Sequence, residues 1–218
     1  MFSKMFKLSI AVTLASLFLP TAASAQQAPS AAKRMNMLGP ESSLLAQRVG
    51  TWDVTETVRA TPGAAPKANH YRVTRKMIGS FLQEIAVPEP GAADQSFRRI
   101  YYLSFNRVEG RWKYVSLVTN SPVGLMPAAS FGPSQNKTIT LQFEPFAVAG
   151  PGGTVTGQML RMDEIITLGA DANHDHSEER FRMADGSGKM WVAFRYDYVR
   201  RGAQVSRTAQ VSQKARVK

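Results

Sequence analysis

The chain of 218 residues contains no cysteine and only three histidines. Without cysteine the chain can form no disulfide bond, carry no lipid on a cysteine and use no thiol nucleophile. A serine-based triad would need one of the three histidines, and the chain has no G-x-S-x-G motif. We therefore assign no catalytic residue, and we expect stability to come from a packed core and a hydrogen-bonded backbone.

The chain also lacks an apolar run long enough to span a bilayer. The longest run near the amino terminus extends from Leu8 to Leu19, after Lys4 and Lys7, whereas a spanning helix needs about 20 residues. Small residues around Ala25 follow it, which is the pattern of a cleaved secretory signal peptide at residues 1–25. We predict export to the periplasm or the medium, and no transmembrane segment.

Acidic residues are absent from both ends of the chain. The predicted signal peptide at residues 1–25 holds two lysines, and residues 200–218 hold six basic residues without an acid. The remainder of the chain has 19 basic against 16 acidic residues. We predict that residues 201–218 form a disordered basic tail. It could solubilise the protein or contact an anionic envelope surface. Nucleic acid is not an expected partner, because no aromatics are interleaved with these cations.

The body of the chain is organised as strands. After a leader at residues 26–47 with a short helix expected at 40–47, apolar and polar residues alternate in short segments separated by Gly, Pro and Asn clusters. We count about ten strands, expected at residues 52–58, 69–79, 80–87, 96–106, 111–119, 137–145, 154–160, 161–169, 176–184 and 189–200. Short connections favour antiparallel neighbours, and so many strands remove their edges by closing. We predict a single all-β domain at residues 48–200, a closed antiparallel barrel of about 8–10 strands.

Turn signals identify two hairpins. Residues 107–110 join two strong strand segments, and 185-DGSG-188 joins the last two. Residues 149–153 are also expected to form a turn, and residues 121–135 a Pro- and Gly-rich connection.

Gly50-Thr51-Trp52 opens the first strand and resembles the G-x-W start of lipocalin-like, or calycin, barrels, where the tryptophan plugs the closed end. By this resemblance Gly50 and Trp52 are barrel-closing residues. We expect Arg195, on the last strand, to pack over Trp52 as a third.

Further segments resemble the family called domain of unknown function 1579, which comprises exported lipocalin-like proteins. The resemblance covers about Leu44 to Arg200. It is carried by Val49–Trp52, Pro62-Gly63, Arg75–Glu84, Tyr102–Asn106, Lys113–Ser116 and Arg195–Arg200. It implies the barrel and an interior pocket, but no activity.

Aromatic and methionine side chains on the strands either line a cavity or fill a solid core. The pocket candidates are Tyr71, Met77, Glu84, Phe105, Tyr114 and Phe143. Glu84, if it points inward, needs a cationic partner such as Arg75 or Arg195, because an unpaired buried charge is costly. Such a pair is more often structural than catalytic.

His174 and His176 have the spacing of metal ligands on one strand face, with Asp175, Glu178 and Glu179 nearby. The segment is rich in turn formers, which favours a solvated loop over a metal site. We therefore expect no metal and no other cofactor.

Three functions remain open. The first is binding of a small apolar or amphipathic ligand inside the barrel, without catalysis. The second is an enzyme acting on such a molecule, with Glu84 or a histidine as the proton carrier. The third is a structural protein whose basic tail meets the envelope.

Overall fold

The computed structural model describes residues 28–148 and 157–202. The predicted signal peptide at residues 1–25, the turn at 149–153 and all but the first two residues of the basic tail lie outside the described residues.

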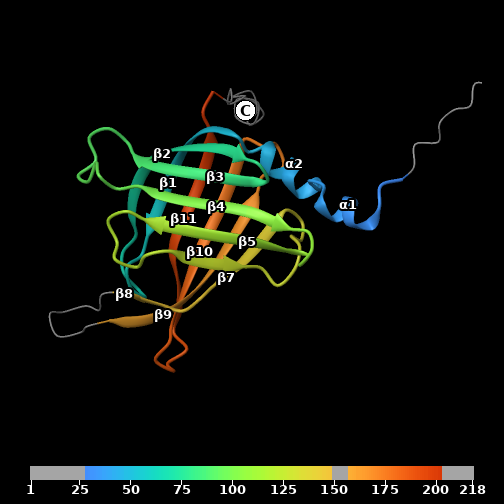
Figure 1. Ribbon diagram of the computed structural model, residues 1–218. Coiled ribbons are helices and arrows are strands. Elements are labelled where there is room, and N and C mark those ends of the chain that lie inside the picture. Colours follow the sequence, from blue (N-terminus) through green and yellow to red (C-terminus); the bar gives the residue numbers. More distant parts are fainter. Residues whose placement is uncertain (1–27, 149–156, 203–218) are drawn as a thin grey trace, which may run out of the picture.

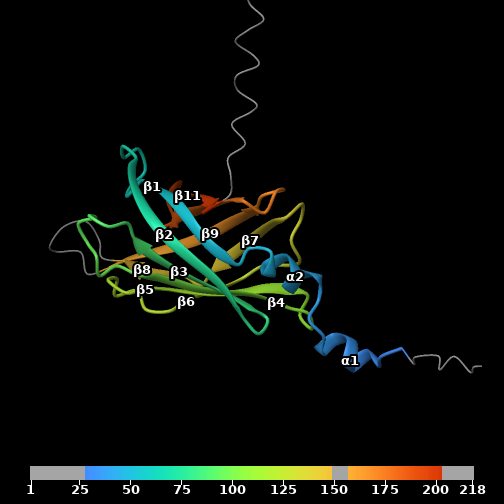
Figure 2. The ribbon, with the colours of Figure 1, turned by 90° about the horizontal axis from the view of Figure 1, so that it is seen from above.

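A single antiparallel sheet closes into a barrel, as predicted (Figure 1). The strands are β1 (Gly50–Val58), β2 (Lys67–Ile78), β3 (Phe81–Pro88), β4 (Arg99–Asn106), β5 (Arg111–Val118), β6 (Met126–Ala129), β7 (Thr138–Phe143), β8 (Phe146–Val148), β9 (Gln158–Leu168), β10 (His174–Met183) and β11 (Met190–Arg200). Strands follow one another around the ring, β11 returns to β1, and β10 joins β11 to β9. Figure 2 shows β1, β2 and β11 on one side of the barrel and β4, β5 and β6 on the other.

Ten strands make the ring, and β8 is an extra short strand on the β7 side of β9. The chain leaves β7 at Glu144-Pro145 and pairs again as β8, because proline cannot continue a hydrogen-bonded ladder. The sequence analysis missed β6, which lies in the connection at residues 121–135, and it divided β9 into two segments.

Both predicted hairpins are confirmed. β4 pairs with β5 in register from Arg99↔Val118 to Asn106↔Arg111. β10 pairs with β11 around residues 184–189, with a register shift between Glu179 and Arg180.

Two short helices precede the barrel, α1 (Ala31–Asn36) and α2 (Pro40–Ala46). Proline opens α2, where its missing N–H is not needed. The predicted short helix is α2, and α1 was not expected; Ser30 caps it by accepting a hydrogen bond from the Lys33 amide at 3.2 Å. Among the described residues, no helix is long and apolar enough to cross a membrane.

α2 packs against β2, β3 and β4 and sends Leu45 into the core without exposure. We call this end of the barrel the closed end; β1, β3 and β5 start there. The other end, with the β1–β2, β3–β4 and β10–β11 loops, is the open end. α1 projects outward from the closed end (Figure 2).

The interior contains two apolar clusters. The larger is built around Leu103, Trp112 and Leu141, and the smaller around Trp52, Val73 and Tyr198. Inward-facing charged side chains are buried in the same barrel, and they define the candidate site.

Candidate functional site inside the barrel

Trp52 is fully buried at the closed end, between two arginines. The guanidinium carbon of Arg75 lies 4.7 Å from the Trp52 ring centroid, and that of Arg200 lies 4.6 Å from it. The prediction for Arg195 is wrong: it is opposite Thr57, away from Trp52, and pairs with Glu178 at 2.7 Å on a half-exposed face. The register of β1 and β11 places Arg200 opposite Trp52, five residues beyond Arg195 along β11.

Gly50 permits this arrangement. Its φ of +140° is a conformation that L-residues with a Cβ rarely adopt, and a Cβ there would lie 2.8 Å from Arg200 Nη1. Arg200 also donates hydrogen bonds to the carbonyls of Gln47 and Val49, each at 2.5 Å. The glycine therefore allows Arg200, at the end of β11, to hydrogen-bond to the segment that leads into β1.

Next to Trp52 lies an ion network, by which we mean Arg48, Arg75, Arg99, Glu84 and Asp175. Arg75 donates from Nε to Glu84 at 2.7 Å and from Nη1 to Asp175 at 2.5 Å. Arg48 pairs with Asp175 at 3.0 Å, and Arg99 with Glu84 at 3.3 Å. All five side chains are at most 9% exposed.

Neutral groups complete the network. The hydroxyls of Tyr101 and Tyr198 donate to the two oxygens of Glu84, at 2.7 and 3.3 Å. Asp175 also accepts from the Gly169 amide at 3.0 Å. Because each carboxylate has several hydrogen-bond and ion-pair partners, neither has a free oxygen to offer a ligand. The network is a structural plug, and the partner that Glu84 requires is Arg75.

Toward the open end, β9 and β10 bring two other carboxyl groups together. Glu164 and Glu179 are directly opposite each other across the pair. Both share the inward face of their strands, Glu164 with Met162 and Ile166, and Glu179 with Ser177. Glu164 is 4% exposed and its Oε2 has no hydrogen-bond partner. Glu164 thus has a buried oxygen without a partner and a second carboxyl group opposite it.

Both carboxyl groups have raised pKa values, Glu164 because of burial and the charge of Glu179, and Glu179 because of burial and the charge of Glu56. Burial and the charge of Glu179 raise the pKa of Glu164 to about 8, although Arg99 and a hydrogen bond from Tyr114 lower it. Burial also raises the pKa of Glu179 to about 7, against Arg99 and a hydrogen bond from Tyr196. Two like charges opposite each other in a partly desolvated site resist ionisation together.

Aromatic and polar side chains surround the pair, and we call this region the carboxyl chamber. Glu56, 5% exposed, accepts hydrogen bonds from Asn69 at 2.7 Å and from the Tyr71 hydroxyl at 3.1 Å. Arg99 stacks on the Tyr196 ring at 4.0 Å, and its Nε has no partner. The chamber thus contains three carboxyl groups and one arginine, which is already engaged with Glu84.

Part of the carboxyl chamber is accessible to solvent. Glu179, Tyr71 and Phe194 point inward and yet are only half-buried. A groove of about 560 Å³ lies at this end between the start of β2 and the β3–β4 loop. Tyr71 and Phe97, with ring centroids 5.2 Å apart, form part of its wall.

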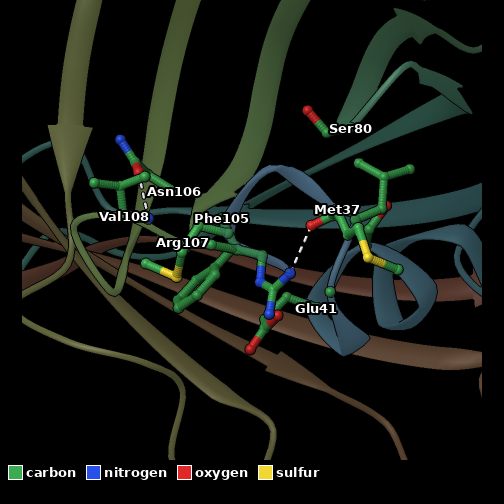
Figure 3. Close-up of a pocket in the computed structure, with 11 residues that line it drawn as sticks. Met37, Glu41, Ser80, Phe105, Asn106, Arg107 and Val108 are labelled. Atoms are coloured by element: carbon green, nitrogen blue, oxygen red, sulfur yellow. Dashed lines mark hydrogen bonds between the residues drawn. The ribbon is translucent and has the colours of Figure 1, made fainter. Parts of the chain in front are cut away.

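The structure distributes the six predicted pocket residues over different regions. Tyr71 lies at the chamber and its groove, and Tyr114 lies behind Glu164. Phe143 and Met77 pack in the larger core cluster, and Glu84 belongs to the ion network. Phe105 lines a closed-end cavity of about 220 Å³ beside α2 (Figure 3).

His174 and His176 are on the outside of β10. Each binds a different carboxylate: His174 lies 2.8 Å from Asp171, and His176 lies 2.8 Å from Asp197. Within residues 28–148 and 157–202, no group of three or more His, Asp or Glu side chains is arranged to hold a metal ion.

The sequence analysis missed Glu164 and did not consider Glu179 as an interior residue. A signal for Glu164 was present, because it alternates with Met162, Ile166 and Leu168 and so occupies an apolar position of a strand. Glu179 carries a weaker signal, since residues 176–180 are all polar and the bulge after Glu179 changes the alternation.

No family model matches the chain. No curated protein matches it either. Among solved structures, the chain is similar to the crystal structure of Rv2717c from M. tuberculosis, with 14% identity and a TM-score of 0.48 over 75% of this chain and 99% of that one.

Proposed function

We propose that this protein binds a small amphipathic molecule in the carboxyl chamber, with the polar end of the ligand on Glu164 and Glu179 and its apolar part among the aromatic residues toward the mouth. The observation that carries the proposal is the buried, unpartnered Oε2 of Glu164 facing a second carboxyl group. A buried polar atom without a partner is costly, and a ligand that supplies one removes that cost.

The carboxyl groups of the chamber favour a cationic ligand that donates hydrogen bonds, because a nearby positive charge allows a buried carboxyl group to ionise. Glu56, Glu164 and Glu179 outnumber Arg99, whose guanidinium already contacts Glu84 and the Tyr198 hydroxyl. An ammonium group donates three hydrogen bonds and carries positive charge. A long-chain amine therefore represents the best ligand class, and a fatty acid, which adds another carboxylate, the poorest.

The apolar part of the ligand would contact the aromatic residues near the mouth. Phe181 lies 5.7 Å from Phe194, 5.6 Å from Trp191 and 6.0 Å from Phe146, measured between ring centroids. Ligand sites generally combine such walls with a few placed polar groups.

Calorimetric titration with dodecylamine, dodecanol and laurate tests the proposal directly. We expect the amine to bind most tightly and laurate most weakly. Glu164→Gln should reduce amine affinity by about tenfold, as expected for loss of a charge-assisted hydrogen bond. Glu144→Gln, on the exposed loop after β7, is the matched control. Equal binding of all three compounds, or tightest binding of laurate, would refute the assignment.

Native mass spectrometry of protein purified from the cells that naturally produce it offers a second test, since a carrier should retain its ligand. A consistently empty protein would count against carriage.

An enzyme acting on the same molecule is the second candidate. It is favoured by the pKa values of about 7 and 8, because a general acid or base works best near the ambient pH. Its proton carriers would be Glu179 and Glu164, because Glu84 is enclosed by the ion network and His174 and His176 face outward. Conversion of the retained ligand on incubation, lost in Glu179→Gln, would favour catalysis over carriage.

A further inference from the structure

Exposed apolar side chains gather at the closed end of the barrel. Of the twelve large apolar side chains exposed within the described residues, nine belong to α1, to the segments around α2 or to closed-end strand tips: Met35, Met37, Leu38, Val49, Ile78, Phe81, Val108, Phe131 and Val199. The other three, Leu125, Met159 and Met190, lie toward the open end. Such a concentration is typical of a surface that meets something other than water.

The apolar side chains are held on a fixed support. Arg107, in the β4–β5 turn, donates hydrogen bonds from Nη1 to the carbonyls of Arg34 and Met37, each at 2.6 Å. Figure 3 shows this arginine between the α1–α2 linker and the turn that carries Val108. The linker and the strand tip therefore present Met37, Leu38 and Val108 together.

Cations flank these apolar groups. Lys33, Arg34 and Lys76 are exposed beside them, and Lys137 is exposed on the β6–β7 loop. The acid of the β4–β5 turn, Glu109, is already paired, with Arg111 and with Lys113. Glu41 lines the same cavity as Met37 and Leu38, and Asp53 pairs with Arg201, so the closed end carries acids as well, but fewer of them than cations.

The carboxyl end of the barrel domain adds charge at the same place. β11 ends at Arg200, which is hydrogen-bonded to the carbonyl of Gln47 just after α2. Arg201 follows, and residues 203–218 contain four more basic residues and no acid. Both ends of the described chain thus bring cations to the closed end.

We propose that the closed end is a docking surface for an anionic lipid bilayer. Cations bind the lipid phosphates, and the apolar side chains of α1, the linker and the strand tips enter the boundary between headgroups and acyl chains. A bilayer fits these observations better than a flat protein partner, because the apolar side chains project from separate tips around the rim. The open end and its carboxyl chamber then face away from the membrane.

Vesicle co-sedimentation of the protein spanning residues 26–218 tests the proposal, and it is independent of any ligand in the chamber. We expect binding to phosphatidylcholine vesicles that contain about 30% phosphatidylglycerol, at least about tenfold weaker binding to phosphatidylcholine alone, and weakening by salt. Lys33→Gln with Arg34→Gln should weaken binding by about tenfold or more. Leu38→Ser with Val108→Ser should do so by about tenfold.

Leu125→Ser with Met190→Ser is the matched control, since it removes two exposed apolar side chains from the open end. Equal binding to both kinds of vesicle would overturn the proposal, as would a loss of binding in this control but not in the closed-end variants. A third result would also overturn the proposal: complete loss of vesicle binding when Arg207, Lys214, Arg216 and Lys218 are replaced by glutamine, with normal binding by both closed-end variants. That result would assign the membrane contact to the tail alone. A dimer in sedimentation velocity that Leu38→Ser with Val108→Ser abolishes, without vesicle binding, would assign the surface to a second copy of the chain.

Discussion

Buried carboxyl groups have opposite surroundings in the two halves of the barrel interior: many partners in the closed half and few in the open half. In the closed half, Glu84 and Asp175 each contact two arginines and further donors. In the open half, Glu164 and Glu179 are opposite each other, and one oxygen of Glu164 has no partner.

This difference is the basis for proposing a structural role for the closed half and a binding role for the open half. A carboxylate whose lone pairs are filled by arginines stabilises the fold and offers nothing to a ligand. A carboxyl pair that is short of donors destabilises the empty protein and is available to a ligand that brings them. Four substitutions test this comparison.

Trp52→Ala should have the largest effect, because the fully buried ring is held between Arg75 and Arg200 and a cavity would remain. We expect a loss of about 3–5 kcal/mol in the free energy of unfolding, measured by urea denaturation. The half-buried Trp191 of the open end is the control, and Trp191→Ala should cost clearly less. Similar losses for the two would mean that the closed end is not the more tightly packed half.

Arg75→Met removes the arginine that links Glu84 to Asp175. We expect a loss of about 3 kcal/mol or more, because two buried carboxylates each lose a charged partner. Arg195→Met, which breaks the half-exposed pair with Glu178, should cost no more than about 1 kcal/mol. If the two variants unfold at the same urea concentration, the ion network does not act as the plug.

Gly169→Ala tests the turn that leads into Asp175. A Cβ at this position would lie 1.8 Å from the carbonyl oxygen of His174, so the β9–β10 connection would have to shift. We expect a loss of about 2–3 kcal/mol. Gly132→Ala, with nothing near the added Cβ, is the control. A melting temperature unchanged by Gly169→Ala would contradict this close approach.

Glu164→Gln should stabilise the protein in a pH-dependent way. The folded pKa of about 8 is above that of an unfolded glutamate, so the folded state binds more protons and stability falls as the pH rises from about 4.5 to 8. Glutamine removes this proton uptake, so the gain should be near zero at pH 5 and on the order of 2 kcal/mol at pH 8. Urea denaturation at both pH values measures it. A gain that is the same at both would show that Glu164 does not hold a raised pKa.

The fold could be predicted from the sequence because alternation and turns are local signals. The hairpins around residues 107–110 and 185–188 follow from residues within a few positions of each other. β6 escaped prediction because its residues lie between prolines and glycines and become a strand only by pairing with β5 and β7.

The site was less predictable because it depends on which residues become opposite each other. Glu84 stands out as an acid among apolar residues, and its need for a cation follows from that position. Nothing local distinguishes Arg75 and Arg200 from Arg195 as the arginines beside Trp52, since strand register alone decides it.

An all-β chain that closes into an antiparallel barrel with a short amino-terminal helix can be predicted from the sequence alone, because periodicity, turn residues and short connections are properties of neighbouring residues. Which buried charges are satisfied depends on the tertiary structure. Glu164 and Glu179 are fifteen positions apart in the chain, and they form a pair because the register of β9 and β10 places both inside a barrel that excludes most of the water around them.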